Sequence, residues 1–294
     1  AIRLATISIP ITLGACIVPL AGWIDSFMLT NLMEGGGMDT TEALVRYGLY
    51  SGMVLTLINV PSAVAAAISM SLVPTISAAI ARGDGNYMRR QSALGLRLAF
   101  VVGMPCTVAM AVLSQRLLSL MFQFTSQANL EKTAHMLSLS AVTIVLFTVV
   151  QATSGILQGL KKQWVPMATL LAGVCVKIFL NYTLIAIPQI NIYGASLASI
   201  TCYTISMVPN LYFVHRYTGL KAEPVGIFLK PTLASALMGV LVGLLSRWLP
   251  DGRLWTILIV LVGVAAYAAF ALLTGAVQKS DLAPLLRRGK KGAE

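Results

Sequence analysis

The chain has few charged residues and a large excess of apolar ones. Of its 294 residues only 11% are charged while 57% are hydrophobic, and the mean hydropathy is +0.83. This composition excludes an ordinary water-soluble domain and favours a protein that resides in a bilayer. The net charge of +11 resembles that of a nucleic-acid binder, but the basic residues lie in short loops between apolar runs. Nucleic acid is therefore not an expected partner.

Residues that typically perform catalysis or bind metals are also scarce. There are four cysteines and two histidines, and the cysteines lie in apolar runs without a CxxC spacing. Such cysteines are usually small buried hydrophobic residues. The sequence contains no nucleophile elbow, zinc motif or phosphate-binding loop. We therefore expect no enzyme activity, no cofactor and no bound metal.

Apolar runs of about 20 residues recur along the chain, which is the pattern of a polytopic helical membrane protein. These runs are too long and too uniformly apolar to be barrel strands. Pro61 and Pro74 indicate that the second run kinks or continues into the membrane interface. The predicted fold is all-α, with eight transmembrane helices at about 4–32, 46–80, 92–113, 134–158, 164–187, 192–214, 227–248 and 254–275.

Loop charges orient these predicted spans. If the first residues are cytoplasmic, 15 of the 21 lysines and arginines fall on the cytoplasmic side, five fall outside, and Lys177 remains in the membrane. This split predicts an even number of spans with both termini in the cytoplasm.

The chain opens with AIRLATISIP, already close to an apolar run and without an initiator methionine. We interpret this start as that of a fragment, or of a separated half of a longer transporter. No polar segment is long enough to form a soluble domain.

Two charges lie deep in apolar runs. Lys177 lies with Asn181 in the run LLAGVCVKIFLNYTLIAI, and Asp25 lies in the first run. A lysine at mid-bilayer costs about 2.5 to 3.5 kcal/mol on insertion scales, so it indicates a functional site with a partner. A helical spacing of four places Lys177 and Asn181 on one face.

Several segments resemble a known family. SLVPTISAAIARGD at 71–84 and Gly103-Met104-Pro105 are similar to the eighth and ninth helices of bacterial polysaccharide-biosynthesis transporters of the stage V sporulation protein B type. GILQGLKKQWVPMATLLAG at 155–173, the pair Lys177 and Asn181, and NIYGASLAS at 191–199 resemble its tenth to twelfth helices. The resemblance runs across most of the chain.

This resemblance implies the multidrug/oligosaccharidyl-lipid/polysaccharide exporter fold, with two six-helix lobes around a central cavity and two further helices in the lipid II flippase branch. The eight spans would be helices seven to fourteen. Residues 1–216 would form the second lobe, and residues 217–294 the two additional helices and a basic cytoplasmic tail. The partners implied are a lipid-linked saccharide, membrane lipids and the missing N-terminal lobe.

The resemblance also implies roles for the intramembrane polar residues. Relatives can hold a cation in the second lobe, for which Asp25 would supply a carboxylate, Asn181 a neutral oxygen, and Ser196 or Ser199 a hydroxyl. Lys177 does not match this pattern, because its ammonium would take the place of a sodium ion. We therefore expect an ion pair between Asp25 and Lys177 supported by Asn181, which rearranges or changes protonation during transport.

Two alternatives to this role stay open. The pair would be a static brace, or each charge would reach water separately. Counting from Arg3 and Lys162 places Asp25 and Lys177 about 10 Å apart in depth if both helices are straight.

Other residues receive weaker expectations. Asn59, Gln151 and Gln158 would line the cavity wall or hydrogen-bond between helices. Four cytoplasmic basic residues would fix topology, attract anionic lipid or meet a lipid-linked phosphate at the entrance; they are Arg89, Arg90, Lys161 and Lys162. Three GxxxG pairs, at 48–52, 155–159 and 239–243, permit close helix packing.

The predicted function is that of a flippase for lipid-linked oligosaccharide or peptidoglycan precursor, working by alternating access. The alternatives are a drug or organic-cation antiporter of the same fold and a non-transporting membrane scaffold. An acidic, aromatic-lined cavity would favour the antiporter.

Overall fold

The computed structural model describes residues 2–124, 126–187, 189–220 and 225–276. This part of the chain is all-α and contains no strand. The predicted basic tail of the chain, from Gln278 onward, lies outside the described residues. The helices are α1 (Ile2–Gly35), α2 (Thr40–Gly48), α3 (Leu55–Ala81), α4 (Gly85–Val112), α5 (Ser114–Met121), α6 (Gln127–Ser140), α7 (Val142–Gly159), α8 (Trp164–Ile185), α9 (Tyr193–Thr218), α10 (Lys230–Trp248) and α11 (Arg253–Leu273), and two π-helical segments are η1 (Leu49–Val54) and η2 (Val225–Leu229).

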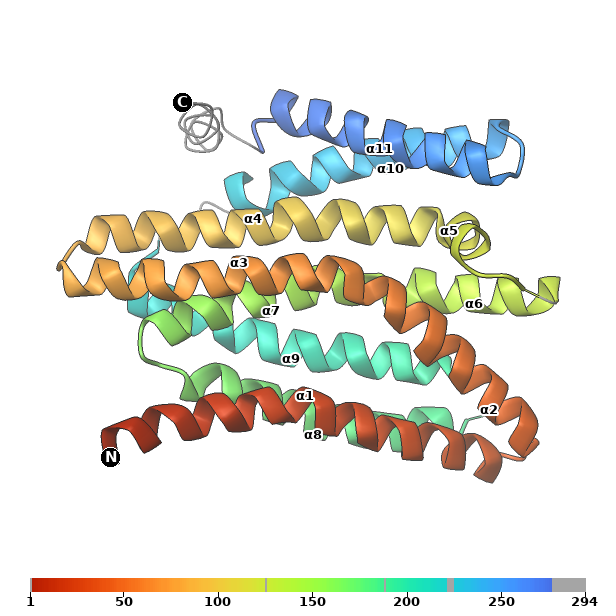
Figure 1. Cartoon of the computed structure of the whole chain (residues 1–294), viewed down its shortest axis with the longest axis horizontal. Coiled ribbons are helices and arrows are strands. Elements are labelled where there is room, and N and C mark those ends of the chain that lie inside the picture. Colours follow the sequence, from red (N-terminus) through yellow and green to blue (C-terminus); the bar gives the residue numbers. More distant parts are fainter. Residues whose placement is uncertain (1, 125, 188, 221–224, 277–294) are drawn as a thin grey trace, which may run out of the picture.

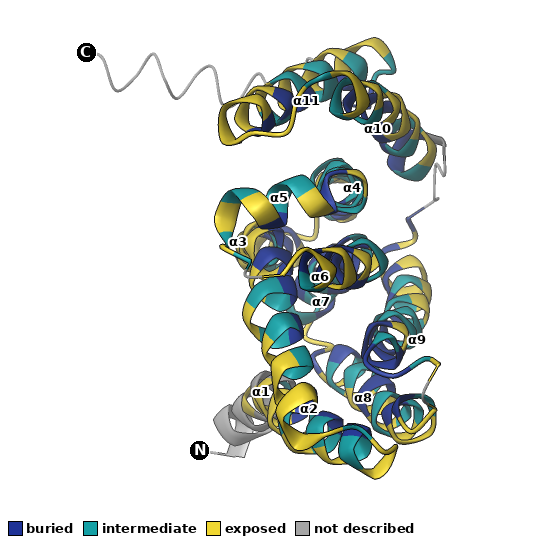
Figure 2. Ribbon diagram, turned by 90° about the vertical axis from the view of Figure 1, so that its right-hand side faces the viewer, coloured by how far each residue is buried: buried dark blue, intermediate teal, exposed yellow. Residues whose placement is uncertain are grey.

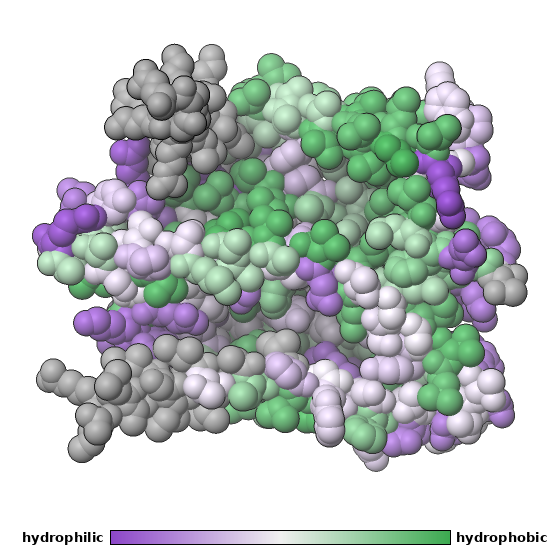
Figure 3. Space-filling model, in the orientation of Figure 1, coloured by the Kyte–Doolittle hydropathy of each residue, from purple (hydrophilic) through white to green (hydrophobic). Residues whose placement is uncertain are grey.

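Seven helical stretches in the described residues are long and apolar enough to cross a membrane. They correspond to the second to eighth predicted spans. The predicted first span falls within α1, which is not among the seven, so the count of eight is not confirmed. Hydrophilic residues collect at the two ends of the helices and hydrophobic residues lie between them (Figure 3). The arrangement is that of a polytopic membrane protein.

The first of these stretches, Thr40–Ala81, is bent (Figure 1). It contains the π-helical segment η1, in which the N–H of Leu55 donates to the carbonyl of Tyr50 five residues earlier. α3 then continues through both Pro61 and Pro74 without ending. π-bulges and prolines are both recognised causes of helix bending. The prolines are thus accommodated within a continuous helix, and the irregular backbone precedes them.

The helices form a layered bundle in which sequence neighbours are not always spatial neighbours. α3, α4 and α7 pack on one another, α7 also packs on α9, and α8 lies between α9 and α1 (Figures 1 and 2). The hairpin of α10 and α11 packs on α4 at the opposite side of the bundle from α1. α1 is therefore attached to the bundle mainly through α8, with further contact to α2.

Glycines allow the closest helix approaches. A Cβ on Gly155 of α7 would come within 2.6 Å of the backbone oxygen of Ser69 on α3, and one on Gly159 would come within 2.7 Å of Ile76. On α4, a Cβ on Gly103 would meet Thr148 of α7 at 2.3 Å. These distances are far below van der Waals contact, so only glycine fits at these positions: Gly155 meets the backbone of α3, and Gly159 and Gly103 make room for the Ile76 and Thr148 side chains.

One arginine ties the α10 and α11 hairpin to α5. The Arg116 guanidinium donates to the carbonyls of Ser246 at 2.7 Å, Leu249 at 2.7 Å and Pro250 at 3.1 Å. It also forms an ion pair with Asp251 at 3.0 Å. The last carbonyls of a helix lack intrahelical partners, and a guanidinium with several N–H groups is suited to satisfy them. Arg116 thus caps the end of α10.

Candidate functional site

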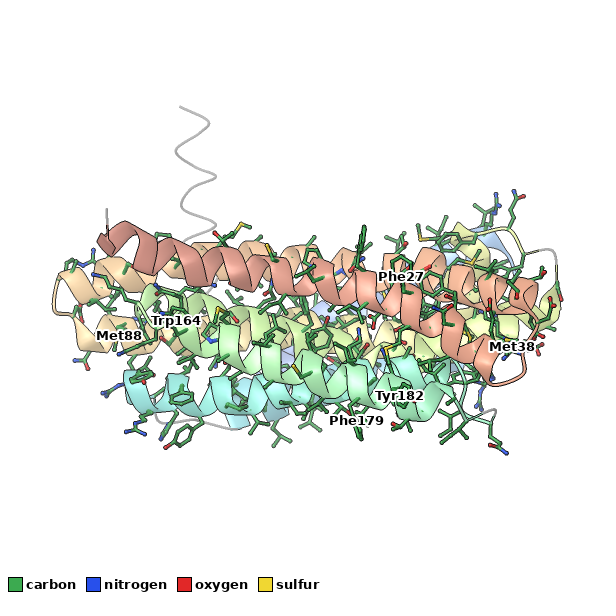
Figure 4. The ribbon with its side chains drawn as sticks, turned by 90° about the horizontal axis from the view of Figure 1, so that it is seen from below. Phe27, Met38, Met88, Trp164, Phe179 and Tyr182 are labelled. Carbon is green, nitrogen blue, oxygen red and sulfur yellow. The ribbon has the colours of Figure 1, made fainter. Side chains whose placement is uncertain are left out.

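The register between α1 and α8 is fixed by close contacts near both ends. A Cβ on Gly14 of α1 would lie 3.8 Å from the Met167 side chain of α8, and one on Gly36 would lie 3.6 Å from the carbonyl of Ala186. These contacts pair residues whose numbers differ by about 150 to 153. The two helices run in the same direction, with α1 beginning farther out than Trp164 (Figure 4).

This register brings Asp25 to Lys177. The Lys177 Nζ donates to Asp25 Oδ2 at 2.5 Å, forming a salt bridge in which the Lys177 and Asp25 side chains are only 16% and 19% exposed. The count from Arg3 and Lys162 predicted that Asp25 and Lys177 differ in depth by about 10 Å, because it placed Arg3 and Lys162 at the same depth in the membrane. The register instead pairs residue 162 with about residue 9 of α1, so the offset disappears.

Asn181, one turn beyond Lys177, completes the group. Its Nδ2 donates to Asp25 Oδ1 at 2.9 Å, so both carboxylate oxygens accept a hydrogen bond. Asn181 is fully buried, and its Oδ1 has no hydrogen-bond partner among the described residues. A buried acceptor without a partner is costly, and a nearby polar cavity is the usual place where such a group finds water.

A cavity of about 320 Å³ adjoins the ion pair. Its polar wall comes from α1, η1, α3, α6, α7, α8 and α9, and includes Asp25, Tyr50, Asn59, Ser140, Thr143, Lys177, Ser199 and Tyr203. On one side the rings of Phe147 and Tyr203 pack edge to face with centroids 5.3 Å apart. The pair is thus largely buried in protein but borders a cavity with polar side chains in its wall, which is large enough for several water molecules.

The predicted hydroxyl residues separate into two positions. Ser199 lines the cavity, whereas Ser196 is fully buried and hydrogen-bonds to Ser140 with their Oγ atoms 2.6 Å apart. That bond links α9 to the end of α6. Sequence reasoning missed both Ser140 and Tyr50, a 5%-exposed residue of η1 that faces Ser196 and Ser199. The only local signal was the position of Tyr50 between Gly48 and Gly52.

The predicted cavity-wall residues are also divided. Asn59 lines the cavity beside the ion pair. Gln151 and Gln158 of α7 are partly buried and are not in its wall. Their contact with a substrate cavity stays a prediction.

The four predicted entrance cations lie together at the end of the bundle where α4 and α8 begin and α9 ends. Arg89 Nε donates to the carbonyl of Thr218 at 3.2 Å, and Lys162 Nζ lies 5.2 Å from the centre of the Tyr217 ring. Lys161 occupies a left-handed turn with φ of 59°. Arg90, like the other three, is exposed. Arg89 and Lys162 therefore also hold elements together.

The site does not fit a sodium ion as arranged. Both Asp25 oxygens face N–H donors, and the ammonium of Lys177 occupies the position next to Oδ2. Nor does the described part of the chain contain a group of three or more His, Cys, Asp or Glu side chains placed to hold a metal. The positive charge next to Asp25 is thus supplied by the protein itself.

Solved structures of membrane transporters share this architecture. One titled "Lipid II flippase MurJ, inward closed conformation" has a TM-score of 0.61 at 19% identity, over 72% of this chain and 44% of that one. An outward-facing multidrug resistance MATE family transporter of the MOP superfamily also has a TM-score of 0.61, at 17% identity, over 90% of this chain and 63% of that one. These similarities show the exporter fold.

The sequence match is more specific. A family model described as lipid II flippase MurJ matches residues 12–263, and the chain belongs to this family of transporters, which are not enzymes. The chain is 26% identical to the lipid II flippase MurJ of Bacillus subtilis (strain 168), over 88% of this chain and 48% of that protein. It is 25% identical to that organism's stage V sporulation protein B, over 83% of this chain and 45% of that protein. The chain thus spans about half the length of these relatives, as the predicted resemblance implied.

Proposed function

We propose that the chain is the C-terminal part of a flippase that moves a lipid-linked oligosaccharide or peptidoglycan precursor across the cytoplasmic membrane by alternating access. The family match supports this reading, and the fold agrees with it. Residues 1–216 act as the second transporter lobe and residues 217–294 as an additional hairpin with a cytoplasmic tail. The partners are the lipid-linked saccharide, membrane lipids and an N-terminal lobe. Both termini lie in the cytoplasm.

Within this function, Lys177 acts as a fixed internal cation for Asp25. The observation that carries this role is the contact of 2.5 Å between Lys177 Nζ and Asp25 Oδ2 in a largely buried site. A carboxylate alone in this environment would need a counter-ion, and here the counter-ion is covalently part of α8. Transport would then proceed without a sodium ion at this site, and the pair would rearrange or change protonation as the lobes move.

The test is Lys177→Gln in the full-length transporter, reconstituted in vesicles with a lipid-linked precursor. The wild type is expected to transport at the same rate in sodium and potassium salts. Gln lacks the charge but keeps an amide at this position, so Asp25 loses its counter-ion and transport should fall at least about tenfold in potassium. Transport should recover partly in sodium, because a sodium ion can then serve as the counter-ion of Asp25. Lys132→Gln removes an exposed lysine of α6 that has no place in the site, and serves as the matched control. If Lys177→Gln transports like the wild type in both salts, Lys177 has no part in the mechanism.

The charge of the cavity also bears on the antiporter alternative. Asp25 is the only carboxylate in the wall of the described cavity, and it is neutralised by Lys177. A pocket for an organic cation would instead present a free carboxylate. This favours a saccharide over an organic cation, and uptake of an organic cation by the wild-type vesicles would reverse that preference.

A further inference from the structure

Two helices are irregular where they border the cavity. η1 interrupts the stretch from α2 to α3, and the neighbouring stretch from α6 to α7 breaks at Ala141. η1 and α6 are in contact, and each contributes a polar residue to the cavity wall, Tyr50 and Ser140 respectively. π-helical segments are rare and are found frequently at functional sites. Their position next to the ion pair therefore needs an explanation.

The glycines around η1 are not required by packing. A Cβ on Gly48 or on Gly52 would meet nothing within 4 Å. The other GxxxG pairs behave differently, since a Cβ on Gly155 would collide with Ser69 and one on Gly239 would lie 2.4 Å from Val108. Gly48 and Gly52 also have no left-handed backbone conformation that would demand glycine. What they provide is backbone freedom just before the π-helical segment, at Gly48, and within it, at Gly52.

The π turn determines where Tyr50 points. Its i to i+5 bond, from Leu55 N–H to the Tyr50 carbonyl, accommodates one residue more than an α-helical turn. If the segment changed to i to i+4 bonding, the residues before it would turn by about 100° relative to α3. Tyr50, now 5% exposed beside Ser196 and Ser199, would leave the cavity.

We propose that η1 is a hinge that moves Tyr50 into and out of the cavity beside the Asp25–Lys177 pair. In the present state the Tyr50 ring fills one side of the cavity and its hydroxyl faces α9. In the other state η1 is α-helical, α2 is rotated, and the pair is open to the space that Tyr50 occupied. Tyr50 is thus a positioning residue, and the role of this movement in transport rests on the proposed function.

The hinge can be tested with Gly48→Ala/Gly52→Ala in the full-length protein. Alanine fits the open space in this state but restricts the backbone, so the melting temperature should stay at or above that of the wild type. Transport should slow about tenfold, because two alanines restrict the change of backbone conformation. Gly85→Ala, which also adds a methyl group in open space, is the matched control: its melting temperature should likewise stay at or above that of the wild type, and its transport rate should be unchanged.

A second measurement keeps the hinge separable from the transport reaction. Spin labels at two exposed positions, Leu44→Cys on α2 and Met70→Cys on α3, in a background free of Cys16, Cys106, Cys175 and Cys202, report the distance across η1. The wild type should show two distance populations and the double alanine variant one. Identical distributions in both would overturn the hinge, even if the protein transports lipid-linked saccharide. Two populations without such transport would overturn the proposed function and leave the hinge intact.

Tyr50→Phe addresses the positioning role. Phenylalanine keeps the ring packing and removes only the hydroxyl that faces α9. The maximal transport rate should fall severalfold while the half-saturating substrate concentration and the melting temperature stay the same. An unchanged maximal rate would show that the Tyr50 hydroxyl has no positioning role.

Discussion

The α3, α4 and α7 helices and the α1 and α8 pair are held together in different ways. On the first side, Gly95, Gly103, Gly155 and Gly159 let helices approach so closely that an added Cβ would lie 2.3 to 2.7 Å from a neighbour. On the second side, the glycine contacts from Gly14 to Met167 and from Gly36 to Ala186 are ordinary, at 3.8 and 3.6 Å. What distinguishes the second side is a charge pair between Asp25 and Lys177.

The glycine contacts among α3, α4 and α7 are suited to be permanent, whereas the charge pair between α1 and α8 is able to change. Backbone contact through glycine has one satisfactory geometry, because any shift loses many dispersion contacts at once. A charge pair next to a cavity of about 320 Å³ has a second set of partners available in water. α1 also exposes large apolar side chains, with Trp23 72% and Phe27 66% exposed. The α1 side is therefore the one suited to move.

The largest effect is expected from breaking the charge pair on one side only. Asp25→Ala leaves the Lys177 ammonium buried without a counter-ion, which should cost about 3–5 kcal/mol in the free energy of unfolding. Unfolding of the purified protein by a denaturant in detergent measures this. The control is Asp25→Leu combined with Lys177→Met, which should regain most of the stability. If that double variant also transports at the wild-type rate, the pair is only a brace.

A smaller loss is expected from the glycine side. Gly155→Ala forces the new methyl group against the backbone of Ser69, and we expect a cost of about 1–3 kcal/mol from overpacking. The matched variant Gly35→Ala adds a methyl group where nothing lies within 4 Å. Equal stability of the two variants, measured by the same unfolding titration, would contradict backbone contact between α3 and α7.

The smallest loss is expected from a neutral polar contact. Ser140→Ala leaves the buried Ser196 hydroxyl without its partner, which should cost about 1 kcal/mol. Hydrogen exchange at the break between α6 and α7 should increase locally. Ser138 lies two residues before Ser140 in α6, and its hydroxyl donates to the carbonyl of Ala111 on α4. Ser138→Ala therefore tests whether the effect of Ser140→Ala is specific to the cavity. If Ser140→Ala lowered the free energy of unfolding as much as Asp25→Ala does, the charge pair would not be what distinguishes this region.

Much of the fold could be predicted because the bilayer constrains it strongly. Long apolar runs in lipid must be helical, so the second to eighth spans are found close to their predicted positions. The residues of the candidate site were also detectable, since an intramembrane lysine is costly enough to imply a nearby partner. Its role in transport stays a prediction.

The rest depends on relations that no local pattern contains. The register of α1 against α8 follows from contacts such as that of Gly14 with Met167, between residues 153 positions apart. η1 differs from an α-helix by a single residue per turn, and its sequence LYSGMV shows no feature that requires it. Tyr50 and Ser140 therefore appear in the site only once the backbone is known.

The cap that Arg116 places on α10 has a consequence for biosynthesis. Its acceptor carbonyls begin 130 residues later in the chain. At about 5–20 residues per second, the guanidinium is made roughly 7 to 26 s before its partners. In that interval the Arg116 guanidinium, in the first turn of α5, must be solvated by water. The hairpin of α10 and α11 then inserts next to a charge that is already present. The contacts of Arg116 with Ser246, Leu249, Pro250 and Asp251 consequently form only after α10 has been synthesised.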